Sequence, residues 1–417
     1  MRSREDSVRL SEAGLFKSVD EGEHILMDSL GGKSIITTIE NICAFGTRWM
    51  GSKGAEETLE YVSREFKNIG MTVELQAFQY PHYQPIQASL VAGTRPILSE
   101  PIALSPSTAI TLEADLVYGG QCTSEGLGQL KAAGVDLHNK IVLSDNLRSF
   151  VSYPEVEAAG AAGFISITNL DENVIRCGCA RLDGKVGTIP AVAIGGVDGR
   201  DIVSKLSNGV KVKASLQSQG NIREMIGHNV IAKDPNAKPP KLLVTAHYDC
   251  FWNGVMAMDN CAGVATVIAL SKAFTLDMRK MTEFVLFGAE ELGCWGSTGY
   301  VHDRRDHFKG INAVLNLDTF GSNKSGVEIG VTKDLEERCR RVVRKRGAEV
   351  DCWNIPPRAA SDHQKFVENG FSAIWIANGG SDTRYHTPLD IPSEMNPSKL
   401  EAVANLAYNL AVELLEV

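Results

Sequence analysis

Leu242-Leu-Val-Thr-Ala-His-Tyr-Asp249 joins a run of apolar residues to two polar residues that could bind a metal. Its apolar beginning predicts a buried strand over Leu242–Ala246, and this strand runs directly into His247 and Asp249. Working outward, three similar strands are predicted at Glu283–Phe287, Ala313–Leu317 and Ala373–Ala377. Helical segments separate the strands. This alternation is typical of α/β proteins whose mostly parallel sheet is covered by helices on both faces.

Polar side chains follow each of these strands. Glu290-Glu291 comes after the second strand, Asp318 after the third, and His386 after the fourth. Asp259, just before a predicted helix, is a further candidate. In open parallel sheets, ligands bind beyond the carboxyl ends of the strands. Because buried carboxylates are costly unless they are paired or bound to metal, this set of His, Asp and Glu favours a divalent metal such as zinc.

Each residue taken alone also has an ordinary structural interpretation. Asp259 could cap a helix predicted over Cys261–Phe274, and Glu290-Glu291 could be first-turn acids that answer a helix dipole. A single histidine such as His247 or His386 is more often a hydrogen-bonded structural group. The joint arrangement at the strand ends is therefore what favours a metal site.

The order of the motifs resembles that of a known enzyme family. The series is H-x-D at 247, D-N-x-x-G-V at 259, E-E-x-G-x-x-G-S at 290, N-L-D at 316, S-D-H-x-x-F at 361 and Y-H-T-x-x-D at 385. It is similar to the co-catalytic di-zinc peptidases, the family of aminopeptidase S, aminopeptidase Y and carboxypeptidase Q. Gly46-Thr-Arg48 resembles the opening segment of that family, and motifs between residues 139 and 192 resemble a protease-associated (PA) domain.

The resemblance implies a role for each candidate residue. Two zinc ions per chain, with Co²⁺ or Mn²⁺ as possible substitutes, would share one aspartate; their ligands would be His247, Asp259 and Asp318 for one ion, and Glu291, Asp259 and His386 for the other. Glu290 would be the general base, Asp249 would orient His247, and Tyr385 would stabilise the oxyanion. The implied reaction is hydrolysis of a peptide or amide bond by a hydroxide that bridges the metals.

The fold class expected is α/β, with a mixed, mostly parallel sheet sandwiched by helices as in zinc-peptidase/phosphorylase-like folds. The catalytic domain is predicted over residues 1–97 and 226–417, with a smaller PA-like α/β insert at 98–225. A short strand is predicted at Thr72–Phe78, and the prolines from Pro81 to Pro106 are predicted to interrupt regular structure after it.

Several further elements are predicted around this framework. An amphipathic helix is expected over Ala55–Ile69, and a long closing helix is expected to begin at Pro397 with Asn396 as its cap. Within the insert, the predicted strands and helices are Lys140–Ser144, Phe164–Ile167 and Ile189–Ile194, and Glu155–Gly163 and Arg200–Leu206.

Charge and composition exclude several classes of partner. The chain of 417 residues has a formal net charge of −9, which gives no general attraction to nucleic acid or anionic lipid. Its apolar runs are shorter than the ~18 residues of a membrane span. The first 14 residues lack the apolar segment of a secretory signal, and the nine cysteines have no framework spacing. We therefore expect a cytoplasmic protein with neither a nucleic-acid nor a membrane partner.

The kind of amide that is cut stays open at this point. An aminopeptidase-type exopeptidase is the first hypothesis; a carboxypeptidase, a dipeptidase and a small-molecule N-acyl amino acid amidohydrolase are the alternatives. A carboxypeptidase or a dipeptidase needs a cation for the terminal carboxylate, and Arg384 and Arg358 are candidates. Cys250 and Cys294 could in principle be thiol nucleophiles, but no base pairs with them in sequence. An inactive receptor-like or scaffold member is a remote alternative, and the insert could cover the site or support a homodimer.

Overall fold

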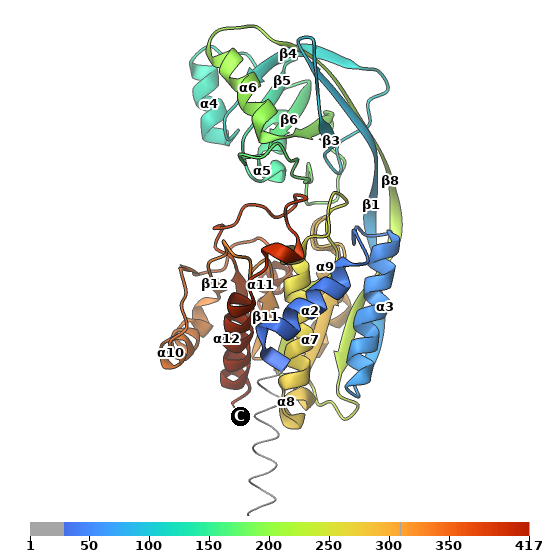
Figure 1. Cartoon of the computed structure of the whole chain (residues 1–417), viewed down its shortest axis with the longest axis vertical. Helices are drawn as coiled ribbons and strands as arrows, with labels where there is room; N and C mark the ends of the chain where they lie inside the picture. Colours follow the sequence, from blue (N-terminus) through green and yellow to red (C-terminus); the bar gives the residue numbers. More distant parts are fainter. Residues whose placement is uncertain (1–28, 309, 417) are drawn as a thin grey trace, which may run out of the picture.

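The computed structural model describes residues 29–308 and 310–416, which form two units joined by a long two-stranded ribbon (Figure 1). The first 14 residues, for which no secretory signal is predicted, lie outside the described residues. Among the described helices, none is long and apolar enough to cross a membrane.

The larger unit is built on a mixed sheet with the strand order β13-β12-β14-β11-β9-β10-β8-β1. Its strands are β1 (Thr72–Ala92), β8 (Lys213–Lys233), β9 (Leu242–His247), β10 (Thr282–Phe287), β11 (Ala313–Leu317), β12 (Glu328–Val331), β13 (Cys352–Asn354) and β14 (Ala373–Ala377). The four central strands, β14, β11, β9 and β10, are parallel, while β12 and β8 run antiparallel to them on either side. These four are the strands predicted from the sequence, and the mixed, mostly parallel sheet is confirmed.

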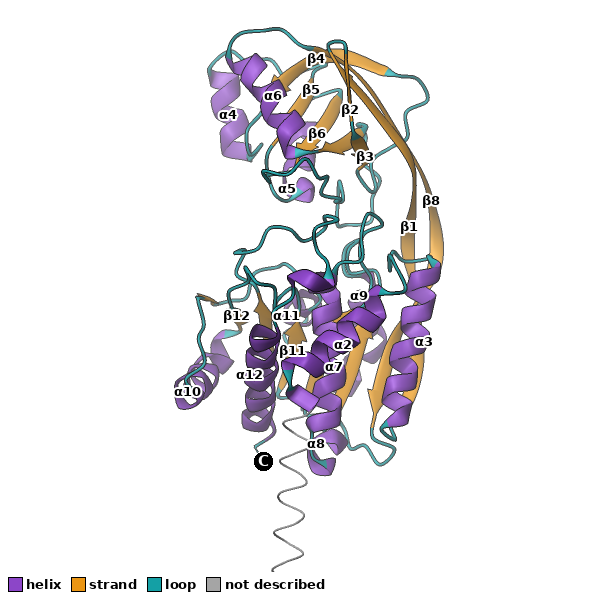
Figure 2. Cartoon of the chain, viewed as in Figure 1, coloured by secondary structure: helices purple, strands orange, loops and turns teal. Residues whose placement is uncertain are grey.

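Helices cover both faces of this sheet (Figure 2). One face carries α2 (Gly32–Cys43), α3 (Lys53–Asn68), α7 (Ala262–Ala273), α10 (Glu336–Arg346) and α12 (Pro397–Leu415), with the short α8 (Leu276–Lys280) nearby. The other face carries α9 (Trp295–Arg304) and α11 (His363–Glu368). Residues 262–271 of α7 are all buried, which explains why this helix is rich in alanine and valine.

The smaller unit is a second α/β layer with hydrophobic clusters of its own. Its strands and helices are β2 (Arg95–Ile97), β3 (Ser99–Pro101), β4 (Leu112–Tyr118), β5 (Ile141–Ser144), β6 (Gly163–Ile167), β7 (Ala191–Ile194), α4 (Ser124–Ala132), α5 (Ser149–Ala158) and α6 (Gly196–Ser207). Strands β4 to β7 are parallel, and β3 pairs antiparallel with β7. The helix predicted over Glu155–Gly163 is present but displaced: α5 begins at Ser149 and ends at Ala158, because Gly160 takes a left-handed φ of 81°.

The prediction that prolines interrupt regular secondary structure after Phe78 is wrong. Strand β1 continues to Ala92 and pairs with β8 along this length, with one register shift between Pro85 and Gln87. From Thr72 to Ser89, β1 hydrogen-bonds β8 alone, so its other edge is free. A proline, which has no N–H to donate, is tolerated on such an edge strand. The two strands form the ribbon that carries the insert above the larger unit (Figure 1).

The closing helix begins as predicted. The side chain of Asn396 accepts a hydrogen bond from the Lys399 N–H at 3.2 Å, and Pro397 occupies the first turn. The apolar stripe from Leu400 to Leu414 is buried against α2 and α7. The cap therefore fixes where the chain turns into a helix that covers the sheet.

We expect Asn396→Ala to lower the free energy of unfolding by about 1 kcal/mol, because the first turn of α12 loses its cap. Urea unfolding followed by circular dichroism measures the change. Asn405→Ala, in the exposed middle of the same helix, is the matched control and should cause no loss. Equal stability of Asn396→Ala and the wild type would show that the cap does not stabilise this helix.

Candidate metal centre

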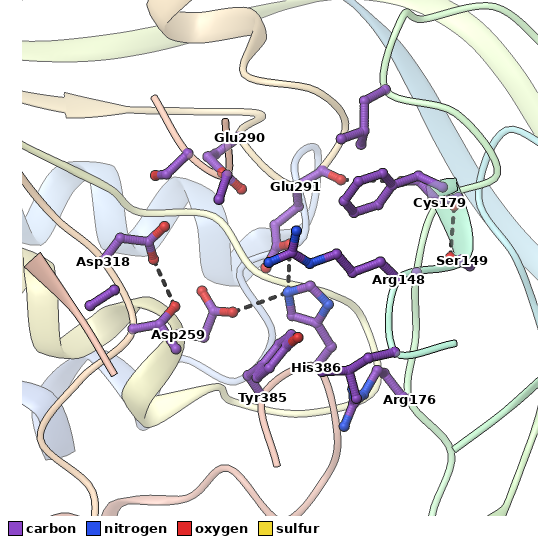
Figure 3. Close-up of a pocket in the computed structure, with 18 of the residues that line it drawn as sticks. Arg148, Ser149, Arg176, Cys179, Asp259, Glu290, Glu291, Asp318, Tyr385 and His386 are labelled. Atoms are coloured by element: carbon purple, nitrogen blue, oxygen red, sulfur yellow. Dashed lines mark hydrogen bonds and ion pairs between the residues drawn. The ribbon is translucent and has the colours of Figure 1, made fainter. Parts of the chain in front are cut away.

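The predicted site residues converge at the carboxyl edge of the parallel strands. His247 is the last residue of β9, Asp318 follows β11 directly, and Glu290-Glu291 follows β10 after a short turn. His386 lies in the loop after β14, and Asp259 lies in the segment before α7. They line one cavity of about 270 Å³ between the two units (Figure 3). This is the placement that ligand sites take in open parallel sheets.

Asp259 joins two groups of potential metal ligands. Its Oδ1 lies 3.2 Å from His247 Nε2, and its Oδ2 lies 3.0 Å from His386 Nε2. His247 Nε2 is also 3.2 Å from Asp318 Oδ1, and His386 Nε2 is 2.9 Å from Glu291 Oε2. Within each group the ligand atoms lie within 4.8 Å of one another. The two groups match the two ligand sets that the family resemblance implies.

The backbone of Asp259 is held by a second buried aspartate, Asp390. Its two carboxylate oxygens accept hydrogen bonds from the Met258 N–H at 2.7 Å and the Asp259 N–H at 3.0 Å. Asp259 does not cap α7, since the Asn260 side chain accepts from the Gly263 N–H at 2.9 Å. The Asp259 carboxylate is therefore free to face both histidines.

Asp249 ties the end of β9 to the paired glutamates. Its carboxylate accepts hydrogen bonds from the N–H groups of Glu290 at 3.1 Å and Glu291 at 3.3 Å. Its carboxylate oxygen is 3.6 Å from His247 Nδ1, whereas its backbone carbonyl oxygen is 3.2 Å away. Both the carbonyl and the carboxylate of Asp249 thus lie beside His247 Nδ1, with the carbonyl as the nearer acceptor, and the orienting role of the carboxylate stays a prediction. The carboxylate orients the turn that carries Glu290.

Burial and mutual charge set the protonation of the cluster. Burial raises the pKa of Glu290 well above its usual range and that of Glu291 to about 7. Burial alone would lower the pKa of His247 and His386, but the surrounding carboxylates raise both well above the ordinary histidine value. A cation bound among these groups would replace the protons that they otherwise share.

The donor set fits zinc. Imidazole nitrogens and carboxylate oxygens are zinc ligands, and each group offers three of them. Glu291 Oε1 is buried without any hydrogen-bond partner, a costly state for a carboxylate oxygen that a cation would relieve. Asp259, Asp318 and Glu291 are each at most 5 % exposed. So much buried negative charge in one place requires a positive partner.

The insert contributes a wall of the same cavity. The Cys177 N–H donates to the His386 carbonyl oxygen at 3.0 Å, and the Cys179 thiol donates to the Glu291 carbonyl oxygen at 3.1 Å. Tyr385 lines the cavity as predicted, and the Arg176 guanidinium lies 4.8 Å from its ring centroid. The insert therefore forms part of the wall of the cavity that contains the site.

The structure contradicts the two arginines proposed from the sequence as carboxylate anchors. Arg384 forms an ion pair with Asp382 at 2.6 Å and another with Glu394 at 2.5 Å. Arg358 is paired with the fully buried Glu328. Because these guanidinium groups are already neutralised by carboxylates of the chain, neither is available to bind an anion.

The thiol alternative is not supported by the site either. Cys250 is fully buried, and burial raises its pKa to about 12. Burial also raises the pKa of Cys294 well above its usual value. Both groups therefore remain protonated near neutral pH, whereas a thiol nucleophile needs the thiolate.

Several residues of the site were missed by the sequence reasoning. Arg48 is fully buried and donates to the Tyr248 and Met256 carbonyl oxygens, at 2.9 and 3.0 Å. Arg148 and Arg176 enter the cavity from the insert. Arg48 belongs to the Gly46-Thr-Arg48 motif, which resembles the family but does not by itself indicate what the arginine does. No local pattern in the sequence distinguishes Arg148 and Arg176 from other arginines.

Comparison with known proteins places this geometry in a family. Residues 229–411 match the model of peptidase family M28. The chain carries an M28 peptidase domain. Aminopeptidase YwaD of Bacillus subtilis is 28 % identical to this chain, over 90 % of this chain and 83 % of YwaD. The family predicted from the motif series is therefore confirmed.

Solved structures show the same fold as this chain. The aminopeptidase from Aneurinibacillus sp. strain AM-1 superimposes with a TM-score of 0.69 and 25 % identity, covering 93 % of this chain and 95 % of its own. BSAP, a zinc aminopeptidase from Bacillus subtilis, gives a TM-score of 0.71 at 23 % identity, covering 92 % and 95 %. The similarity extends over both units, so the architecture of the whole chain is shared.

We expect Zn²⁺ to raise the melting temperature of the metal-stripped protein, because a cation that binds only the folded state adds to its stability. The gain is about 4 kcal/mol when free zinc is a thousand times its dissociation constant. Differential scanning calorimetry with and without ZnCl₂ measures the shift. His302→Ala, a change to an exposed histidine, should keep the full shift, while His386→Ala should reduce it. An unchanged melting temperature in the wild type would exclude these residues as a zinc site.

Proposed function

We propose that this chain is a zinc-dependent, aminopeptidase-type exopeptidase that hydrolyses a peptide or amide bond. The observation that carries the proposal is the Asp259 carboxylate, whose two oxygens face two separate histidine–carboxylate groups beside Glu290. The names of the relatives support it, since these proteins are described as aminopeptidases and one as a zinc aminopeptidase.

The finer proposal is that the centre holds two zinc ions. His247 and Asp318 would hold one ion, Glu291 and His386 the other, and Asp259 both. When bound, the ions supply Lewis acidity that polarises the scissile carbonyl and lowers the pKa of water. Each ligand group contains one imidazole and two carboxylates. The two groups therefore offer a cation the same kinds of ligand.

The side chains of the protein supply the proton transfer and the positioning. Glu290 lines the cavity, and burial raises its pKa above the ordinary carboxyl value, which makes its carboxylate a stronger base for taking a proton from water and passing it to the leaving amine. Asp249 holds the Glu290 backbone in place. Tyr385 stands beside His386, with ring centroids 4.8 Å apart, where its hydroxyl can donate to the developing oxyanion.

We expect Glu290→Gln to lower kcat for leucinamide by about 10²- to 10⁴-fold, because the amide cannot accept the proton. Zinc content should stay near two equivalents per chain, whereas His386→Ala should retain about one. Product formation is followed by chromatography, and metal by mass spectrometry on the same samples.

Glu172→Gln, at an exposed position in the insert, is the control and should leave both readouts at the wild-type value. Full turnover by Glu290→Gln would remove Glu290 from the mechanism. A single zinc equivalent in the wild type would contradict the paired centre, and no turnover of any aminoacyl amide by the zinc-loaded wild type would contradict the proposed function itself.

We also propose that the insert is a PA-type domain and that the protein works in the reducing cytoplasm. Hydrophobic clusters separate from that of the larger unit support an independent insert domain. All nine cysteines are free, including Cys43 and Cys261, whose sulfur atoms are 3.5 Å apart. Cysteines this close remain unpaired most readily in a reducing compartment. Recovery of the protein outside the cytoplasm in a fractionation of the native cells would overturn the assignment of compartment.

A further inference from the structure

Arg148 of the insert extends into the cavity toward the metal-binding side chains (Figure 3). It precedes the first residue of α5, and its backbone N–H is held by the Asn146 side chain at 3.0 Å. Within the described part of the chain, the Arg148 guanidinium forms neither a hydrogen bond nor an ion pair with another residue. Its charge and its five N–H donors therefore face the cavity unused.

The backbone next to Arg148 is fastened to the metal centre. The Ser149 hydroxyl donates to the Cys179 carbonyl oxygen at 2.7 Å, and the Cys179 thiol donates to the Glu291 carbonyl oxygen. Ser149 is buried, and Cys179 is only 2 % exposed. These contacts hold the start of α5 at a fixed place relative to Glu291, so the position of Arg148 is built into the fold.

Arg176 adds a second guanidinium with unused donors on the same wall. It is 7 % exposed, and one of its nitrogens donates to the Thr383 carbonyl oxygen. Its Nε and Nη1 are buried without a hydrogen-bond partner. Tyr385 and Asp382 lie near this guanidinium and favour its charged form, so Arg176 adds positive charge to the wall while two of its donors still lack a hydrogen-bond acceptor among the described residues.

The third arginine that lines the cavity, Arg358, is not available to bind an anion. Arg358 is neutralised by Glu328 and lies 5.6 Å from the centroid of the Trp375 ring. On the metal side, the carboxylates of Asp259, Asp318 and Glu291 belong to the two ligand groups and would be occupied by the cations that these groups hold. Arg148 is then the guanidinium of this cavity that has no carboxylate partner among the described residues, and Arg176, which lies near Asp382 and Tyr385, stands behind it.

We propose that Arg148, backed by Arg176, binds a carboxylate of the substrate, so that the preferred substrates carry a carboxylate on a residue flanking the bond that is cut. This inference rests on the proposed function, because it concerns the same cavity. A guanidinium binds a carboxylate through two parallel hydrogen bonds. At about 270 Å³, the cavity is near the small end of ligand sites, which are about 300–1,000 Å³. The substrate is a short, anionic peptide or amide.

The carboxylate can come from a free C-terminus or from an acidic side chain, and two substrate pairs distinguish these sources. The zinc-loaded full chain is assayed on Leu-Gly against Leu-glycinamide, and on Glu-glycinamide against Gln-glycinamide. In at least one pair, we expect kcat/KM to be about 10- to 100-fold higher for the carboxylate member, the size of one charge-assisted interaction. Arg148→Met should reduce that ratio to near one, and Arg148→Lys should give an intermediate ratio.

A binding measurement keeps this inference separate from the proposed function. Calorimetric titration of the preferred carboxylate substrate into zinc-loaded Glu290→Gln should give a dissociation constant that rises about tenfold or more when Arg148→Met is added. Arg200→Met, an exposed arginine of the same insert outside the cavity, is the control and should change neither ratio nor affinity.

These experiments separate the carboxylate site from the proposed peptidase function. Turnover of all four substrates with both ratios near one would overturn the carboxylate site and leave the peptidase function intact. Turnover of none by the wild type would overturn the function, and the titration would still decide whether Arg148 binds a carboxylate. Equal affinity with and without Arg148 would overturn the carboxylate site.

Discussion

The crowding of negative charge around Asp259 is the constraint on which the rest of the molecule depends. Asp259, Asp318 and Glu291 are nearly inaccessible to water, and they lie together with two imidazoles in one small region. Like charges at such distances repel strongly where the dielectric constant is low. The cluster is stable only if cations or protons are shared among its members. Metal binding therefore stabilises the same strand ends that carry the ligands.

The surrounding structure can be understood as a frame for that cluster. Parallel strands bring three of its members to one edge, and Asp249 and Asp390 use their carboxylates to hold backbone N–H groups of the ligand-bearing loops. Arg48 in turn occupies the carbonyl oxygens of the segment before Asp259. Each of these buried polar groups has a defined partner, which limits how far the ligands can move when no metal is bound.

The sequence predicted the central strands and the cluster because each signal is local. A run of apolar residues ending in His247 or Asp318 contains both the strand and its functional residue. Pro85 misled the prediction, because whether proline ends a strand depends on whether its free edge meets another strand. Arg148 could not be assigned, since the metal-binding side chains that it faces lie between His247 and His386, far along the chain, and nothing in its own neighbourhood differs from a surface arginine. The proposed roles of Arg384 and Arg358 are wrong because both arginines are ion-paired: Arg358 with Glu328, thirty residues earlier, and Arg384 with Asp382, a nearby carboxylate whose pairing the sequence alone does not reveal.

The ribbon has a consequence for how this architecture can vary. Ala92 and Ala214, where the chain leaves β1 and returns in β8, are directly paired. From the viewpoint of the catalytic sheet, the whole insert is therefore the loop of a single β-hairpin. Its length, composition and shape can change without altering the spacing of the two ends, so substrate selectivity can diverge while the metal-binding edge of the sheet is inherited unchanged.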